Sequence, residues 1–380
     1  MSDFTVDDVR YMERALMLAR NGEGRVSPNP PVGCVLVKNG HVVGEGWHDR
    51  LGGLHAEAMA LGNAGEAARG AACYVTLSPC TTTGRQPPCA DALIAAGVGD
   101  VCIAAEDPNP QNANGADVLR RANIPVRTGL LKEESEYLAR GFFKRQRRRL
   151  PYVTLKYAMT LDGKIASASG DSRWVSGPES RELVQDIRSR SDAIMVGSET
   201  ALSDNPLLNI REPVLSRRGG FAHPQPIRVV VDSRARLSLM AAMLDEGKGL
   251  GGPVIVAATD DAPRRKVMEL ADAGAEVVQF AAKDSRVPLT LLLSELEERG
   301  IGMVLCEGGG HLAAGLLAEG LVDEVVAFIA PKILGGRHAP GPVAELQLER
   351  MSDALPFAVG ECLRVGDDIM IKAFAKNRTR

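Results

Sequence analysis

His55-Ala56-Glu57, Pro79-Cys80 and Pro88-Cys89 are the segments around which the first half of the chain is organised. One His and two Cys can hold a zinc ion through three protein ligands and leave a fourth coordination position open for water. Glu57, two residues after the His, supplies a carboxylate that can take up a proton and pass it on. We therefore predict a catalytic zinc site with His55, Cys80 and Cys89 as ligands and Glu57 as the catalytic proton carrier.

Each of these segments is expected next to the end of a helix or strand. Asn39-Gly40 lies between two short apolar runs, which is a strong hairpin signal, and Gly52-Gly53 breaks the chain before a helix. The resulting order of strands and helices predicts an α/β sandwich around one sheet. The expected elements are a helix over 7–20, strands over 32–37 and 41–46, a helix from about 54, a strand over 72–77, a helix over 89–96 and a strand over 100–105.

A His-x-Glu motif followed by Pro-Cys and a second Cys is typical of zinc-dependent nucleobase deaminases. Here eight residues separate Cys80 from Cys89, where the general signature has two. Two other interpretations stay open: a structural zinc ion, which normally has four protein ligands, and a core without metal. His48 could be the fourth ligand or, as we favour, a substrate contact.

Composition narrows the class of protein. The 380 residues include 45% hydrophobic and 24% charged residues, as expected for a globular chain of two or three domains. The net charge is −3 and aromatic residues make up 4%, so nothing favours nucleic acid as a partner. No apolar run reaches the roughly 18 residues of a membrane span. Seven scattered cysteines behind an acidic N-terminus suggest reduced thiols and a cytoplasmic protein.

The second half alternates short apolar strands with helices, which predicts a largely parallel sheet. A single helix over 131–146 should connect the halves, and its basic end, Lys144–Arg149, suits a helix C-terminus better than nucleic acid. Gly308-Gly309-Gly310 follows a buried strand and opens a helix, where free backbone N–H groups can receive a pyrophosphate. By itself such a turn is weak evidence for a nucleotide.

Several further motifs extend the zinc pattern: Ser27-Pro28-Asn29-Pro30-Pro31-Val32-Gly33, the run from Gly84 to Leu93, Asp107-Pro108-Asn109-Pro110, and the run from Lys156 to Lys164. With them, nearly the whole chain resembles the bifunctional deaminase/reductase family of riboflavin biosynthesis. The long Cys spacing is the one this family uses. The resemblance implies an N-terminal cytidine-deaminase-like α/β/α sandwich (residues 1–147) and a C-terminal dihydrofolate-reductase-like α/β domain (residues 150–378).

The resemblance also implies two consecutive reactions on a small phosphoribosyl pyrimidine. A Zn²⁺-dependent step removes the 2-amino group of 2,5-diamino-6-(5-phosphoribosylamino)pyrimidin-4(3H)-one, and an NADPH-dependent step reduces the ribosyl group to ribityl. The residues alone do not distinguish NADPH from NADH, and no arginine stands out for the 2′-phosphate. The sequence leaves a homo-oligomer open.

Site residues follow from the resemblance by position. The substrate contacts it implies are Asn29, His48, Arg85, Lys156, Ser172, Arg188, Leu208, Arg211 and Glu307. The cofactor contacts it implies are Ala158, Trp174, Thr200, Asp204, Ser233, Gly309, Gly310, His311, Leu312, Ala313, Ala314 and Gly315. Arg188 and Arg211 can bind the 5-phosphate in bidentate fashion, and Trp174 can pack against the nicotinamide end.

The chain departs from the family pattern beside the first cysteine. Ser78 stands where the family usually has Glu, and Thr81-Thr82 stands where it usually has Ser-His. A threonine can keep a hydroxyl contact but cannot supply an imidazole. Two alternative functions therefore remain: a reductase whose deaminase half has decayed, and a deaminase of another nucleobase.

Overall fold

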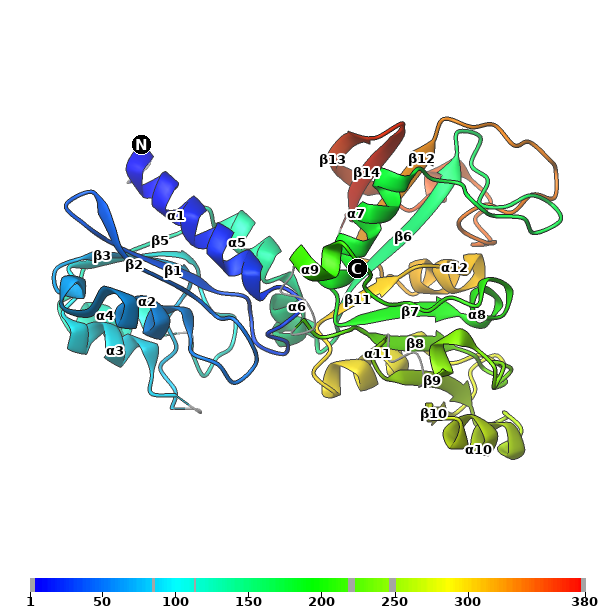
Figure 1. Ribbon diagram of the computed structural model, residues 1–380, viewed down its shortest axis with the longest axis horizontal. Helices are drawn as coiled ribbons and strands as arrows, with labels where there is room; N and C mark the ends of the chain where they lie inside the picture. The colour runs from blue at the N-terminus through cyan, green and yellow to red at the C-terminus, as the bar shows by residue number, and fades with distance from the viewer. Residues whose placement is uncertain (1–3, 84–85, 113, 218–222, 246–250, 377–380) are drawn as a thin grey trace. The chain divides into compact units, whose positions relative to one another are not determined.

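A computed structural model describes residues 4–83, 86–112, 114–217, 223–245 and 251–376 (Figure 1). The chain divides into two compact units, Met1–Arg149 and Leu150–Arg380. Each unit has its own sheet and its own core, and each is described by itself.

The N-terminal unit is built around a five-stranded sheet in the order β2-β1-β3-β4-β5. Strand β1 is antiparallel to both of its neighbours, β2 and β3, whereas β3, β4 and β5 are parallel. Its main elements are α1 (Val6–Ala19), β1 (Gly33–Lys38), β2 (His41–Trp47), α2 (Ala56–Ala64), β3 (Ala72–Leu77), α3 (Cys89–Ala96), β4 (Asp100–Ala105), α4 (Gly115–Arg121), β5 (Val126–Thr128), α5 (Lys132–Leu138) and α6 (Arg140–Arg148).

Helices cover both faces of this sheet, which makes the predicted α/β/α sandwich (Figure 1). Alternate residues of β1 divide between the faces: Cys34 and Leu36 pack toward α2, α3 and α4, and Val35 and Val37 pack toward α1. This period of two is the ordinary consequence of the pleat. Both sets are buried, which explains why the sequence of this strand is a continuous run of apolar residues.

The helix α2 lies unusually close to β2. A side chain on Gly44 or Gly46 would collide with the backbone of α2 at Ala60 or Ala56. Glycine in the strand and alanine in the helix thus let two backbones come into contact. This contact fixes the start of α2, where His55 and Glu57 lie.

The C-terminal unit contains a nine-stranded sheet in the order β10-β9-β8-β7-β11-β6-β12-β14-β13. The first seven strands in this order are parallel, and β14 and β13 add two antiparallel strands, so the predicted parallel character holds for most of the sheet. The strands are β6 (Tyr152–Thr160), β7 (Ala193–Gly197), β8 (Ile227–Val231), β9 (Val254–Thr259), β10 (Glu276–Phe280), β11 (Met303–Cys306), β12 (Glu324–Ala330), β13 (Phe357–Val365) and β14 (Asp368–Ala375).

The middle of this sheet is buried on both faces. Ala193 and Met195 of β7 pack against α11 and α12, and Ile194 and Val196 pack toward α8 and α10. Burial on both faces is the usual setting of parallel strands. The helices are α7 (Pro178–Ser189), α8 (Ser198–Asp204), α9 (Val214–Arg217), α10 (Arg264–Asp272), α11 (Leu289–Glu298) and α12 (Gly310–Ala318).

Two expectations about the elements were wrong. The single helix expected over 131–146 is two helices, because the chain bends at Ala139 (φ −95°, ψ 19°) where Ala139 and Phe143 pack on Leu77. The strand β13 was not expected. Its pattern is interrupted at Gly360 by an irregular register with β14, and most of its residues are exposed.

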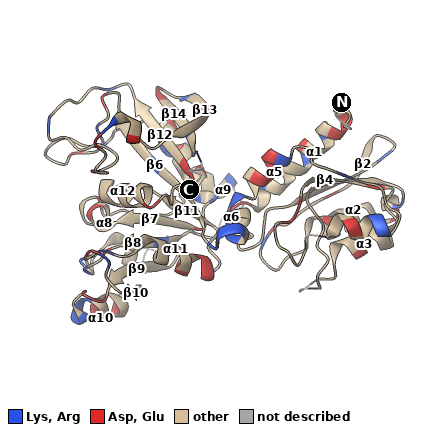
Figure 2. Ribbon diagram, turned by 180° about the vertical axis from the view of Figure 1, so that it is seen from behind, with Lys and Arg blue, Asp and Glu red and all other residues tan. Residues whose placement is uncertain are grey.

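Figure 2 shows the basic residues of α6 in blue, and the side chains of this run make local contacts. Arg145 donates to the carbonyl of Pro28, and Arg147 lies 3.4 Å from a Glu136 carboxylate oxygen and over the ring of Phe143. These contacts favour the structural interpretation of the run. Across the described ranges, no helix combines the length and apolar character that crossing a membrane would require.

Asp8 connects α1 to the sheet. Its carboxylate accepts from the Thr5 backbone N–H, the Tyr74 hydroxyl and both Nη atoms of Arg127, at 2.7–2.9 Å. The hydrogen bonds from Arg127 hold the pKa of Asp8 well below its usual range, against the opposing effect of burial. One buried carboxylate therefore caps α1 and ties it to β3 and β5.

We expect Asp8→Asn to lower the free energy of unfolding of this unit by about 2 kcal/mol at neutral pH, because Arg127 loses its charged partner. The folded pKa of Asp8 is depressed, so its contribution is complete above the unfolded pKa of about 3.9 and disappears as pH falls through the lower folded value. Urea unfolding at pH 7 and at pH 3, followed by tryptophan fluorescence, measures this difference. Asp7→Asn, at an exposed position, should change little. Equal effects of the two substitutions at pH 7 would contradict the assignment.

Candidate functional site

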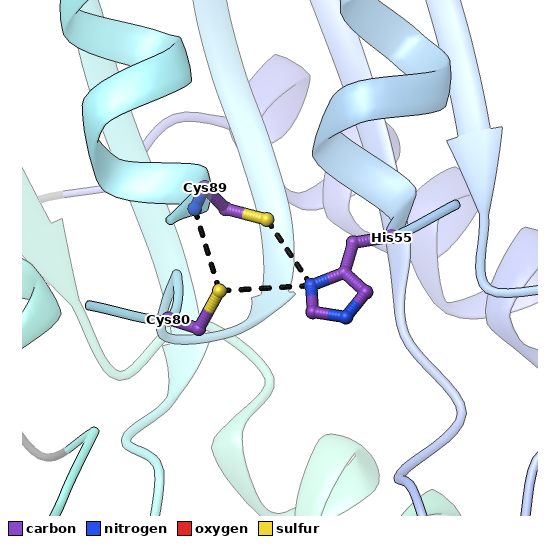
Figure 3. Close-up of side chains that lie close together, drawn as sticks. All are labelled: His55, Cys80 and Cys89. Atoms are coloured by element: carbon purple, nitrogen blue, oxygen red, sulfur yellow. Dashed lines mark hydrogen bonds between the residues drawn. The ribbon is translucent and has the colours of Figure 1, made fainter. Parts of the chain in front are cut away.

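Three segments of the N-terminal unit bring His55, Cys80 and Cys89 together (Figure 3). His55 is the N-cap residue of α2, Cys89 is the first residue of α3, and Cys80 lies in the loop after β3. The Cys89 backbone N–H donates to the Cys80 sulfur at 3.3 Å. The site is thus formed where a strand ends and two helices begin.

The spacing of the three ligand atoms suits zinc. His55 Nδ1 lies 3.3 Å from Cys89 Sγ and 3.6 Å from Cys80 Sγ, and all three atoms lie within 4.8 Å of one another. A tetrahedral zinc ion with bonds of about 2.1 Å to nitrogen and 2.3 Å to sulfur would separate N and S by roughly 3.6 Å. The residues therefore fit the ion with little rearrangement.

The two thiols of the site differ in their protonation. Hydrogen bonds from Cys89 and from His55 lower the pKa of Cys80 to about 4, although burial opposes the shift. The hydrogen bond to Cys80 and burial raise the pKa of Cys89. A thiolate is the form that binds metal, so the surroundings of Cys80 favour its ligand form.

Glu57 lies in the first turn of α2 and is 4% exposed. Burial raises its pKa to about 7. A carboxyl with a pKa near neutrality can both accept and release a proton. A bound divalent cation would lower this pKa and favour the carboxylate.

His48 and Asn29 form a second pair beside the triad. The His48 ring lies edge-on to that of His55 with centroids 5.5 Å apart, and its Nε2 lies 3.1 Å from Asn29 Nδ2. His48 Nδ1 lies 2.9 Å from the carbonyl of Leu54, so this nitrogen carries the proton and Nε2 accepts from the amide. Burial lowers the pKa of His48, which favours this neutral form. With both ring nitrogens engaged, His48 is better placed as a neighbour of the site than as a fourth ligand.

The loop between the cysteines is held by a residue that sequence reasoning missed. Asn112 Oδ1 accepts from the Thr82 hydroxyl at 2.8 Å and from the Thr81 backbone N–H at 3.4 Å. Nothing in the polar run after Asp107 marks Asn112 beforehand, since the contact spans 30 residues. Arg85, predicted to contact phosphate, lies outside the described residues.

The second predicted site lies in the C-terminal unit, at the ends of its parallel strands. Arg188 of α7 makes a paired contact with Glu307, with Nε at 2.5 Å and Nη2 at 2.8 Å from the two carboxylate oxygens, and its Nη1 donates to the Asn209 carbonyl. The edge of Arg188 that would grip a phosphate in bidentate fashion is therefore occupied by Glu307. No hydrogen bond or ion pair is seen for the Arg211 guanidinium among the described residues.

Lys156 of β6 is near this ion pair. Its ammonium lies 5.8 Å from the ring centre of Phe328, and burial lowers its pKa despite the charge of Glu307. Leu208, in the segment after α8, is buried and has a positive φ of 49°. Ala158 lies further along β6, paired with Phe328 of β12.

The segment around Trp174 lies by the end of α8. Trp174 is 64% exposed, and the Arg181 guanidinium stacks on its ring at 4.5 Å. Arg173 donates to the carbonyl of Asp204 at 3.3 Å, which brings the stretch containing Ser172 toward that residue. An exposed indole has room to pack against a ligand.

The glycine turn after β11 adopts backbone conformations that favour glycine. Gly308 (φ 155°) and Gly309 (φ 91°) lead into α12, whose N-cap has no side-chain hydrogen bond. The first N–H groups of α12 are thus available to an anion. A side chain on Gly308 would approach Thr200. Ala313 and Ala314 are buried within α12, and the Gly310 carbonyl accepts from Ala344.

A cavity of about 600 Å³ opens beside this turn. Five of the predicted cofactor residues line it, namely Ser233, Gly309, His311, Leu312 and Gly315. Three basic residues that the sequence did not single out also line it, namely Arg236, Lys283 and Arg286. Ala158, Trp174, Thr200 and Asp204 do not belong to this lining.

Comparison with known proteins identifies the family. Residues 151–371 match the family model described as the RibD C-terminal domain, and residues 5–105 match the cytidine and deoxycytidylate deaminase zinc-binding region. The chain belongs to the RibD family. The riboflavin biosynthesis protein RibD of Actinobacillus pleuropneumoniae is 42% identical over 97% of this chain and 95% of its own, and that of Escherichia coli K12 is 41% identical over 96% and 99%.

Solved structures of the family have the same fold. A structure of Acinetobacter baumannii RibD superposes with a TM-score of 0.85 at 38% identity, covering 98% of this chain and 99% of that one. A Thermotoga maritima protein gives a TM-score of 0.83 at 34% identity, covering 97% and 99%. The chain is thus a bifunctional enzyme of riboflavin biosynthesis, with a zinc-binding deaminase domain and a reductase domain that uses NADPH.

We expect Cys80→Ala and Cys89→Ala to reduce the zinc content of the purified protein from about one ion per chain to a small fraction of that, because each removes one of three ligands. Atomic absorption on the purified variants measures this. Cys362→Ala, at an exposed position in the other unit, is the control and should keep its zinc. Full zinc content in Cys80→Ala would mean that another residue, such as His48, completes the site.

We expect Asn112→Ala to lower kcat/KM for deamination about tenfold while zinc content stays unchanged, because the loop between the ligands loses its support. Thr82→Val should have a similar effect, and the double variant should be little worse than Asn112→Ala alone, since Asn112→Ala already removes the hydrogen bond to Thr82. Glu133→Ala, at an exposed position of α5, is the control. Additive losses in the double variant would mean that the two residues act separately.

Proposed function

We propose that the deaminase domain acts on 2,5-diamino-6-(5-phosphoribosylamino)pyrimidin-4(3H)-one and that the reductase domain converts the ribosyl group of the product to ribityl. The observation that carries this proposal is the buried Glu57 beside three converging zinc ligands, with Asn29 and His48 at the same site. The related Thermotoga maritima structure is titled as a diaminohydroxyphosphoribosylaminopyrimidine deaminase/5-amino-6-(5-phosphoribosylamino)uracil reductase.

In the first reaction, His55, Cys80 and Cys89 would hold the zinc ion, which supplies a Lewis acid that makes water nucleophilic at neutral pH. Water attacks C2 of the pyrimidine. Glu57 passes the first proton of the water to the ring nitrogen. It then passes the proton of the new C2 hydroxyl to the amine, which leaves as ammonia as the C2–N bond breaks and the C2 carbonyl forms. Asn29 and His48 are proposed to contact the pyrimidine, and the Asn29 amide is oriented for this by its hydrogen bond to His48 Nε2.

In the second reaction, NADPH supplies the hydride, and the protein contributes position and charge. We propose that Arg211 binds the 5-phosphate, since no protein partner is seen for its guanidinium among the described residues. Arg188 and Glu307 remain paired with each other beside it. The half-buried amine of Lys156, with its lowered pKa, is placed to contact the sugar. Ser172 and Leu208 complete the proposed substrate contacts.

The cofactor contacts are proposed along the turn and around the cavity. The N–H groups at the start of α12, from Gly310 to Leu312, would receive the pyrophosphate, because that of Ala313 already donates to the Gly309 carbonyl. Ser233 would face the adenylate end of the cofactor, and Ala313, Ala314 and Gly315 are proposed contacts on their position in the family. Trp174, with its exposed indole, would pack against the nicotinamide. Ala158, Thr200 and Asp204 are proposed cofactor contacts on the position of these residues in the family.

We also propose residues 1–147 as the deaminase domain and 150–378 as the reductase domain, which agrees with compact units that meet at Arg149 and Leu150. A cytoplasmic location is proposed because seven free thiols and the use of NADPH suit a reducing compartment. A homo-oligomer is proposed on the exposed outer strand β13, where Val359 and Leu363 are 67% and 45% accessible.

We expect Glu57→Gln to reduce ammonia release at least 100-fold, because the proton carrier is lost, and to leave NADPH oxidation with the deaminated substrate unchanged. Separate assays of ammonia and NADPH on one preparation measure both steps. Glu66→Gln, on the exposed turn after α2, is the control and should keep both activities. Loss of both activities in Glu57→Gln would contradict two separate sites.

The same assays separate the alternatives. A wild-type protein that holds zinc and oxidises NADPH yet releases no ammonia would indicate a decayed deaminase half. This alternative is tested because Ser78, Thr81 and Thr82 depart from the family pattern. Ammonia release from RNA in place of the free pyrimidine would indicate another nucleobase substrate.

A further inference from the structure

The cavity beside the glycine turn has a basic wall. Arg236, Lys283 and Arg286 line it, and Ser233 lies among them. Arg236 follows Ser233 by three residues, and the backbone N–H of Val287, next to Arg286, donates to the Ser233 hydroxyl oxygen at 3.2 Å. The Ser233 hydroxyl proton can therefore still be donated to a ligand.

A tight turn places two of these cations side by side. Lys283 and Arg286 exchange both backbone hydrogen bonds, at 3.0 and 2.9 Å, so they are directly opposite one another. The residues between them, Asp284 and Ser285, both have positive φ (50° and 59°), as a two-residue hairpin turn requires. Opposed residues of such a pair project their side chains to the same face, and both line the cavity.

The three cations differ in how far they are neutralised. Arg236 donates to the Ser198 hydroxyl at 2.6 Å and lies 3.6 Å from the buried carboxylate of Asp232. No hydrogen bond or ion pair is seen for the side chains of Lys283 and Arg286 among the described residues, and both are exposed. The turn therefore holds the two cations that are open to a ligand.

Among the described residues, no acidic residue of the lining is seen in an ion pair with Lys283 or Arg286. Glu319, near the end of α12, accepts from the Thr290 hydroxyl at 2.7 Å. Asp284 is within the turn itself, and Glu199 follows Ser198 at the start of α8. A carboxylate such as Glu199 suits a ribose hydroxyl, whereas paired cations suit a dianionic phosphate.

We propose that Lys283 and Arg286, with Ser233 and Arg236, bind the 2′-phosphate of NADPH and so select this cofactor over NADH. This inference rests on the use of NADPH by the reductase domain and deepens it. The glycine turn at the start of α12 would receive the pyrophosphate, and Val287 and Leu289 supply an apolar wall for the adenine. The basic turn thus accounts for a specificity that the sequence alone left undecided.

Fragments of the cofactor test the proposal without catalysis. Isothermal titration calorimetry on the full-length protein would compare adenosine 2′,5′-bisphosphate with 5′-AMP, which differ only in the 2′-phosphate. We expect the wild type to bind the bisphosphate more tightly. The double variant Lys283→Gln/Arg286→Gln should weaken bisphosphate binding about 10- to 100-fold and leave 5′-AMP binding within about twofold.

Two variants serve as controls. Arg286→Lys keeps the charge and should retain most of the preference, and Arg364→Gln removes an exposed arginine on β13 and should change neither affinity. Unchanged binding of 5′-AMP also reports that the cavity of the double variant is folded. Higher ionic strength should weaken bisphosphate binding in the wild type more than in the double variant.

The proposal is overturned if the double variant keeps the full preference for the bisphosphate, or if it loses both fragments equally. Wild-type protein that binds NADPH but does not favour the bisphosphate over 5′-AMP would overturn the 2′-phosphate site, and the use of NADPH by the reductase domain would still stand. Wild-type protein that binds neither fragment nor NADPH would overturn both this proposal and the proposed cofactor contacts.

Discussion

The close approach of α2 to β2 is the constraint on which the N-terminal site depends. Gly44 and Gly46 lack side chains, so the strand backbone touches the helix backbone at Ala56 and Ala60. This contact fixes the first turn of α2 in space. His55 is the N-cap residue of this turn, and Glu57 is buried within it. The proposed zinc ligand and the proposed proton carrier are thereby held on one rigid element, as a preorganised site needs.

Both sites use the same local architecture. In each unit a buried strand ends, and the chain turns into the N-terminus of a helix: β3 leads through Cys80 to α3, and β11 leads through the glycine turn to α12. The free N–H groups and positive end of such a helix stabilise anions. In the first unit this environment favours a thiolate, and in the second it suits a pyrophosphate.

The loop between Cys80 and Cys89 is where this chain differs most from its family pattern. The structure gives its threonines a role, because Thr81 and Thr82 both contact Asn112. These contacts hold the loop without the imidazole that the family usually has there. The ligand geometry is independent of that change, since the Cys89 N–H and the imidazole of His55 position the Cys80 sulfur.

The sequence by itself determined the class of fold, the strand that precedes Cys80, the helix that begins at Cys89, and the three candidate metal ligands. These features depend on local patterns in the sequence: the regular spacing of apolar residues, the positions of Gly and Pro between elements, and a motif with few alternative interpretations. It also located the glycine turn of the second site, but the turn alone could not name a cofactor.

Only the tertiary structure decided which distant residues meet. Asn112 reaches Thr82 across 30 residues, and Arg188 closes on Glu307 across 119, so no local pattern marks either contact. From its sequence alone, the basic turn at Lys283–Arg286 is indistinguishable from an ordinary surface turn. It becomes a candidate phosphate site because the parallel sheet brings the ends of β7 and β8, the turn and α12 around one cavity. Bends such as that at Ala139 likewise depend on packing, which propensity does not encode.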